Sequence, residues 1–184
     1  MRIVLILTLL SIGISSFCQK TKVQSAEISG WKVEDSKLVW SKVYFAESRT
    51  ISEFIKGFEF LAKNSSAVNL STKDEGSMIG TFSNLILKYE EFDYNLIDTP
   101  FLISRARHSG KIEVEIKEGR YKVIITDIVS FLDTYQKKGS VYTWNEDFLD
   151  RKNSIKEEMK ETLILADKNF SVSFDVKSQI KNGK

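Results

Sequence analysis

Cysteine and histidine are nearly absent from this chain of 184 residues, which contains one of each, Cys18 and His108. This count excludes zinc sites built from several cysteine and histidine ligands. A catalytic triad based on histidine would have to use His108, because the chain has no second histidine. A single cysteine cannot form a disulfide within the chain, so the fold must be stabilised by its hydrophobic core.

The chain also lacks an excess of either charge, since 27 lysines and arginines oppose 25 aspartates and glutamates. It has no basic block, and Lys111 and Lys122 alternate with acidic residues such as Glu113. Nucleic acid binding requires a continuous basic surface, so no nucleic acid partner is expected. The segment 76–80, GSMIG, lacks the lysine and the following helix of a phosphate-binding loop, and no cofactor is expected.

The chain begins with the pattern of a secretory signal peptide. Arg2 supplies one positive charge, an apolar run extends from Ile3 to Ile14, and small residues follow. The apolar run is shorter than the ~20 residues that a membrane-spanning helix needs. Cleavage after Cys18 would leave Gln19 as the new N-terminus, so the protein is expected to be exported, to the periplasm or beyond the cell.

Cys18 also allows a second interpretation, in which it is the lipid-modified residue of a bacterial lipoprotein. Such sites prefer a small residue before the cysteine, and Phe17 is not small. A freely exported chain is therefore favoured over a chain anchored at Cys18.

The stretch from Gly110 to Ile128 alternates apolar and charged residues, as expected for a β-hairpin with one buried face. A two-residue loop at Glu118 and Gly119 would define its register. This register pairs Ile116 with Tyr121, Val114 with Val123 and Ile112 with Ile125, and it places Glu115 opposite Lys122 on the other face.

The residues before this hairpin are predicted to form a third strand, from Phe101 to Arg107. A three-residue loop, 108–110, would join it to the strand 111–117, and the last strand would span 120–128. His108 would then lie at an exposed hairpin tip, where it is interpreted as a solvated loop residue and not as a general base.

A helix is predicted to begin at Ile51, because its apolar residues recur with helical spacing. Thr50 and Glu53 match a capping box at its start, and Asn64 can end it. The other predicted elements are strands at 37–45, 68–72 and 78–88 and a helix at about 145–167, with a helical tail favoured over a strand after residue 169. These elements predict an α+β domain, in which a curved antiparallel sheet of about five to six strands carries helices on one face.

An acidic segment lies between two of these strands and contains the candidate binding residues Glu90, Glu91, Phe92, Asp93 and Tyr94. The acids lack the ordered spacing of a calcium loop, so no metal site is predicted. Phe92 and Tyr94 either form an interaction patch or pack over the sheet edge. Packing is the favoured alternative, and the patch remains the candidate binding loop.

Four segments together resemble a family of secreted proteins of unknown function from gram-negative bacteria, described as having a TATA-binding-protein-like fold. They read WSKVYF, FLAKN, DEGSMIG and IKEGRYKVIITDI, and the resemblance covers roughly residues 37–134. It implies a curved antiparallel sheet backed by helices and no known activity. The fold name carries no implication of DNA binding. The expected organisation is a signal peptide (1–18), a lead-in (19–36), this domain (37–134) and a helical extension packed on it (135–184).

These observations favour an exported, non-catalytic domain that binds or scaffolds an unidentified protein or small ligand in the cell envelope. No catalytic residue is assigned. The first alternative is a hydrolase that uses carboxylates alone, since acids are plentiful. Nucleic acid binding by analogy of fold is the third and least supported alternative.

Overall fold

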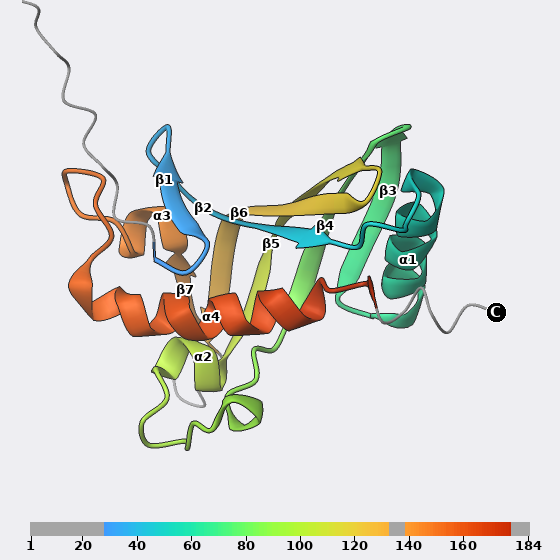
Figure 1. Ribbon diagram of the computed structural model, residues 1–184. Helices are drawn as coiled ribbons and strands as arrows, with labels where there is room; N and C mark the ends of the chain where they lie inside the picture. Colours follow the sequence, from blue (N-terminus) through green and yellow to red (C-terminus); the bar gives the residue numbers. More distant parts are fainter. Residues whose placement is uncertain (1–27, 133–138, 178–184) are drawn as a thin grey trace, which may run out of the picture.

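A computed structural model describes residues 28–132 and 139–177 (Figure 1). The predicted signal peptide, with Cys18 and Gln19, lies outside these residues. The elements follow the order β1 (Trp31–Glu34), β2 (Lys37–Phe45), α1 (Ile51–Asn64), β3 (Val68–Asp74), β4 (Ser77–Leu85), η1 (Glu90–Phe92), α2 (Phe101–Arg105), β5 (Ala106–Lys117), β6 (Arg120–Leu132), β7 (Ser140–Thr143), α3 (Trp144–Asp147), η2 (Glu157–Met159) and α4 (Lys160–Ser173).

The strands form one antiparallel sheet of seven strands in the order β1-β2-β6-β5-β4-β3, and β7 pairs with the C-terminal part of β6. The helices pack on one face of the sheet, where α4 crosses it and α1 lies beside β3 (Figure 1). The predicted α+β class and the curved antiparallel sheet are confirmed, with more strands than expected.

The predicted register of the β5–β6 hairpin is confirmed. Lys117 pairs with Arg120 around the two-residue loop, and Val114 lies opposite Val123. Both valines are fully buried on the face covered by the helices. Gly119 has φ +72, a left-handed conformation that glycine adopts without the steric cost of a side chain.

The predicted strand at 101–107 is wrong in its first five residues, because 101–105 form the short helix α2, and only 106 and 107 belong to a strand, β5. The carbonyl of Pro100 accepts hydrogen bonds from the backbone N–H groups of Ile103 and Ser104. Leu102 and Ile103 are both buried, although they are consecutive. A strand would direct them to opposite faces, whereas a helix can bury both side chains.

The predicted loop at 108–110 is also wrong, since β5 continues through these residues. Gly110 is not left-handed; the ring of Phe82 occupies the space that a Cβ would need, at 2.7 Å. The register shifts by one residue opposite, where Asp127 has φ 52. This β-bulge changes which residues of β6 face the core, from odd to even numbers after Asp127.

Helix α1 begins as predicted. The Glu53 backbone N–H donates to the Thr50 hydroxyl, and the Glu53 carboxylate accepts from the Thr50 backbone N–H, which completes the capping box. Phe54 and Phe58 meet the ring of Tyr121 edge to face, with centroids 5.0 and 5.1 Å away. The helix therefore covers the end of the sheet near the β5–β6 loop.

The continuous helix predicted for about 145–167 is wrong in its middle part. The Asp150 carboxylate accepts hydrogen bonds from the backbone N–H groups of Lys152 and Ser154, both at 2.8 Å. These bonds stabilise a turn that separates α3 from α4. The helical character predicted after residue 169 is confirmed as far as Ser173, where α4 ends.

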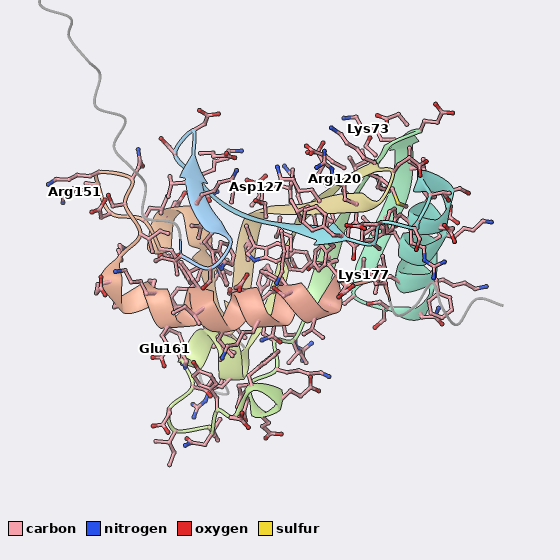
Figure 2. All side chains as sticks on the ribbon, in the orientation of Figure 1. Lys73, Arg120, Asp127, Arg151, Glu161 and Lys177 are labelled. Atoms are coloured by element: carbon pink, nitrogen blue, oxygen red, sulfur yellow. The ribbon has the colours of Figure 1, made fainter. Side chains whose placement is uncertain are left out.

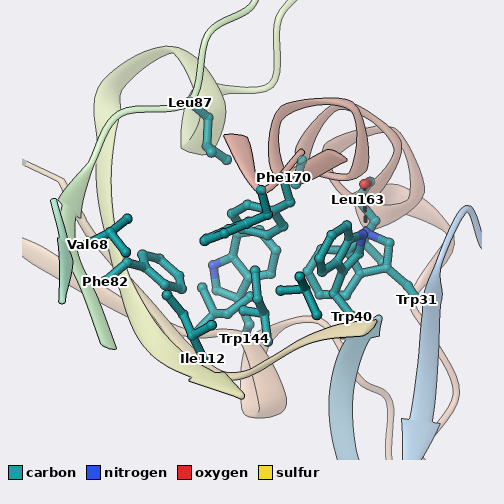
Figure 3. Packing of buried hydrophobic residues seen from close by; sticks show 14 of the residues in the cluster. Trp31, Trp40, Val68, Phe82, Leu87, Ile112, Trp144, Leu163 and Phe170 are labelled. Carbon is teal, nitrogen blue, oxygen red and sulfur yellow. Dashed lines mark hydrogen bonds between the residues drawn. The ribbon is translucent and has the colours of Figure 1, made fainter. Parts of the chain in front are cut away.

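The hydrophobic core lies between the sheet and α4 (Figure 3). Trp31, Trp40 and Trp144 are buried in it. Phe170 of α4 packs against the rings of Trp31 and Trp40, and the indole N–H of Trp31 donates to the carbonyl of Leu163 at 2.8 Å. Strand β1 and helix α4 thus share one core with the central strands. None of the helices within the described residues combines the length and the apolar composition of a membrane-spanning segment.

Candidate interaction surface

The connection from β4 to α2, residues 86–100, extends away from the sheet at the bottom of Figure 1. It is long for a connection inside a compact domain, and such loops are commonly functional. Its start is fixed to α4 by Asn169, whose side chain accepts from the Lys88 backbone N–H at 2.6 Å and donates to the Lys88 carbonyl at 2.7 Å. The loop therefore has a defined position relative to the core.

The predicted binding residues lie in the first half of this loop. Phe92 and Tyr94 are half-buried against the core, and the ammonium group of Lys168 lies 5.9 and 5.1 Å from their ring centroids. The aromatic pair thus packs beside α4, whereas the favoured sequence interpretation placed it over the sheet edge. Glu91 forms an ion pair with Lys88, while Asp93 adopts the left-handed conformation that ends η1.

The second half of the loop presents two aliphatic side chains that sequence reasoning missed. Leu96 is 53% exposed and Ile97 is 93% exposed. They lie in a turn closed by Asn95, whose side-chain oxygen accepts from the backbone N–H groups of Ile97 and Asp98 at 2.9 and 3.0 Å. The Thr99 hydroxyl donates back to the Asn95 carbonyl at 2.6 Å. We call residues 95–99 the loop tip.

The loop tip has an acidic margin. No lysine or arginine occurs between Lys88 and Arg105, whereas Glu90, Asp93 and Asp98 lie around the exposed aliphatic residues in the sequence and are all exposed. In the described part of the chain, no group of three or more acids, histidines or cysteines is arranged to hold a metal ion. The tip is thus an apolar projection with negative charge beside it.

The prediction that His108 lies at an exposed hairpin tip is wrong, because the residue is fully buried near the start of β5. The indole N–H of Trp144 donates to the Ser130 hydroxyl at 2.6 Å, and Ser130 lies 2.9 Å from Nδ1 of His108. We assign the Ser130 proton to this second bond, so that Nδ1 accepts and the ring proton lies on Nε2. Nε2 has no hydrogen-bond partner within the described residues.

This environment makes His108 a poor base. Burial lowers its pKa from 6.5 to about 4. No charged side chain contributes to the shift, so the ring lacks the carboxylate that orients and stabilises the histidine of a triad. His108 and Ser130 are both 0% exposed, and neither can reach a substrate in this structure.

The other strongly perturbed groups are two buried tyrosines. Burial raises the pKa of Tyr121 and of Tyr44 well above the usual range, with the negative charge of Asp175 adding to both shifts. The Tyr121 hydroxyl accepts from the Val176 backbone N–H and lies 3.2 Å from the Phe174 carbonyl. These tyrosines fix the C-terminal end of α4 to the sheet.

The sheet face opposite the helices carries the charged residues of β5 and β6. A cleft of about 170 Å³ lies at its hairpin end, and it is lined by Val43, Glu115, Lys117, Arg120, Tyr121 and Lys122. We call it the hairpin cleft. Glu115 lies opposite Lys122, as predicted, but within the described residues neither forms an ion pair. A shallower groove of about 470 Å³ crosses the same face between Ile79 and Ile124.

No family model and no curated protein matches the sequence. Two solved structures align with most of the chain. A TBP-like protein from Parabacteroides distasonis aligns with a TM-score of 0.54 and 16% identity over 83% of this chain and 97% of that one. A protein of the DUF4468 family from Bacteroides ovatus aligns with a TM-score of 0.49 and 19% identity over 79% and 91%. The first similarity confirms the predicted TBP-like fold. At 16% identity it is evidence for the fold only, and not for a function.

Proposed function

We propose that this protein is an exported, non-catalytic domain that binds a protein partner through its loop tip. The observation that carries the proposal is the 93% exposure of Ile97 on a turn closed by side-chain hydrogen bonds. Exposed aliphatic side chains on a pre-ordered loop lose little conformational entropy when they bind. The complementary surface on the partner is an apolar pocket with basic residues at its rim, because Asp98 belongs to the tip and the exposed Glu90 and Asp93 precede it closely in the sequence.

The burial of the titratable groups supports a binding role over the alternative of a carboxylate hydrolase. A hydrolase of that kind needs two acids converging in a cleft, one of them with a raised pKa. In the described part of the chain, the buried polar residues are Thr99, His108, Ser130, Thr162 and Asn169, and none is an acid.

Exchange of both aliphatic residues of the loop tip, Leu96→Ser with Ile97→Ser, is expected to abolish partner binding without unfolding the domain. The recovery of crosslinked complexes from producing cells should fall at least about tenfold, since exposed apolar anchors commonly dominate binding energy. Circular dichroism and thermal unfolding should be unchanged, because both side chains are exposed.

The matched control is Phe60→Ser with Val172→Ser, which removes aliphatic and aromatic surface of similar exposure, 51% and 62%, from two helices. This control should keep the crosslinked complexes. Equal losses in the two double variants would show that general surface hydrophobicity, and not the loop tip, causes the association.

Export is supported by the signal-peptide pattern of residues 1–18 and by the resemblance to a family of secreted proteins. We expect the mature protein to begin at Gln19. Intact-mass measurement of the protein isolated from cells tests this: cleavage before Gln19 gives an unmodified mass, whereas a mass that includes a lipid-modified Cys18 would establish anchoring. A mass that includes Met1 would contradict export through a cleaved signal.

A further inference from the structure

The hairpin cleft carries positive charge that the rest of the domain does not neutralise. Lys117, Arg120 and Lys122 surround it, opposed by Glu115 alone. Within the described residues, none of these three cations forms an ion pair or a side-chain hydrogen bond. By contrast, Lys37 and Lys111 on the same side of the sheet both pair with Asp127, at 3.4 and 2.8 Å.

Strand β2 places Val43 in the lining of this cleft, and Phe45 lies two residues further along the same strand. Val43 is 43% exposed and lies opposite Lys122, and Phe45 is 62% exposed and lies opposite Arg120. Two apolar residues therefore lie directly beside two unpaired cations. A ligand that fits this surface offers aliphatic groups and carboxylates at a similar spacing.

The loop tip together with its acidic margin has this composition. Leu96 and Ile97 can pack on Val43 and Phe45, and the carboxylates of Glu90, Asp93 and Asp98 can approach Lys117, Arg120 and Lys122. We propose that the loop tip of one copy of this protein docks into the hairpin cleft of a second copy. This inference rests on the proposed function, in which the loop tip is the binding surface, and it names the partner as the same chain.

The position of the two surfaces determines the kind of assembly. The loop that carries the tip projects from the bottom of the view, whereas Arg120 lies in the upper right part of the same view (Figure 2). A copy that presents its loop tip to one neighbour therefore leaves its own cleft open to another. Contacts of this head-to-tail kind produce rings or open chains of copies.

The contact is small, because one turn and one cleft of about 170 Å³ contribute most of it. Interfaces below the standard size of ~1,600 Å² are weak and transient. We expect association in the range of about 0.1–1 mM, with strong dependence on salt, since the charges of both surfaces are exposed and easily screened.

Charge exchange between the two surfaces tests this inference by sedimentation velocity of the purified protein at low salt. The double variant Arg120→Glu with Lys122→Glu reverses the charge of the cleft. The double variant Glu90→Lys with Asp93→Lys reverses the charge of the acidic margin of the loop tip. Each double variant alone is expected to associate at least about tenfold more weakly than the wild type. A mixture of the two variants should associate again, because each reversed surface then meets one of opposite sign. Far-ultraviolet circular dichroism checks that both variants remain folded.

A wild-type protein that stays monomeric up to about 1 mM at low salt would overturn the inference, as would a mixture of variants that fails to associate. The inference would also be overturned if the wild-type protein stays monomeric but binds vesicles containing phosphatidylglycerol through Arg120 and Lys122. The cleft would then bind a membrane surface and not a second copy of the chain. In all of these cases the proposed function still stands if Leu96→Ser with Ile97→Ser abolishes crosslinking in cells, so the two failures are distinguishable.

Discussion

Replacement of Phe170 by alanine is expected to lower the free energy of unfolding by about 3–5 kcal/mol. Phe170 is fully buried in α4, and its ring lies 5.4 Å from that of Trp40, 6.0 Å from that of Trp31 and 5.9 Å from that of Phe82. Because strands from both halves of the sheet meet at this ring, its removal leaves a cavity that the surrounding rigid indoles cannot fill.

Denaturant unfolding monitored by circular dichroism measures this change. The matched control on the same helix is Val172→Ala, which removes a side chain that is 62% exposed and should change stability by less than about 0.5 kcal/mol. A loss below about 1 kcal/mol for Phe170→Ala would mean that α4 does not pack on the sheet as described.

Acidification is expected to destabilise the fold through His108 between pH 6.5 and about 4. The unfolded chain binds a proton at the histidine below pH 6.5, whereas burial keeps the folded chain neutral there. Stability from this group is therefore complete above pH 6.5 and falls as the pH decreases toward the folded pKa. The total loss is about 3 kcal/mol, at 1.36 kcal/mol for each pH unit of the shift.

The exposed carboxylates that contribute to acid sensitivity act in a lower range. Hydrogen bonds and nearby lysines hold the pKa values of Asp74, Asp127 and Asp150 below their usual value, so their stabilising effect is lost at more acidic pH than that of His108. The loss of folding stability above pH 4 thus reports mainly on the protonation of His108.

Two measurements check this prediction. Because the chain contains one histidine, an NMR titration of its imidazole protons gives the pKa of His108 without assignment of other rings. The variant His108→Gln, which keeps an acceptor for Ser130 and does not titrate, should lose about 3 kcal/mol less stability than the wild type between pH 7 and pH 4. A folded-state pKa near 6.5, or equal losses in the two proteins, would show that His108 is accessible to solvent.

The β5–β6 hairpin could be predicted from the sequence because two independent patterns agree on it. Apolar residues alternate on both strands, and Glu118-Gly119 provides a two-residue loop with a glycine in the position that requires positive φ. Only one register buries every apolar residue of both strands at once, so Val114 had to face Val123. The capping box of α1 is similarly local, since Thr50 and Glu53 are three residues apart.

His108 was misplaced because the β-bulge at Asp127 is not visible in the alternation. An unbroken pattern ends β6 at Ile128, and residues 108–110 then appear as the loop through which the strand predicted at 101–107 pairs with 111–117. The bulge changes the parity of β6 and lets the strand continue to Leu132, so that Ser130 and His108 pair in the core. Asp127 offered a weak signal, since aspartate tolerates the left-handed conformation better than most residues.

The candidate binding loop remains a prediction, and its most exposed residues, Leu96 and Ile97, were not among those singled out from the sequence. Aromatic residues drew attention to Phe92 and Tyr94, whose position depends on Lys168, a residue of α4 that is distant in the sequence. Leu96 and Ile97 could have been found from Asn95, because an asparagine before a short apolar pair often closes a turn through its own side chain. Their exposure still required the structure, since it depends on what packs beside the turn.

The most direct measurement of the central claim is photocrosslinking from the loop tip in producing cells. A photoreactive amino acid in place of Ile97 should form a defined crosslinked product with a second copy of the chain or with another protein. The same group in place of Val172, a residue of α4 that is 62% exposed, should form none. Absence of any product from position 97, or identical products from both positions, would contradict the conclusion that the loop tip is the binding surface of this domain.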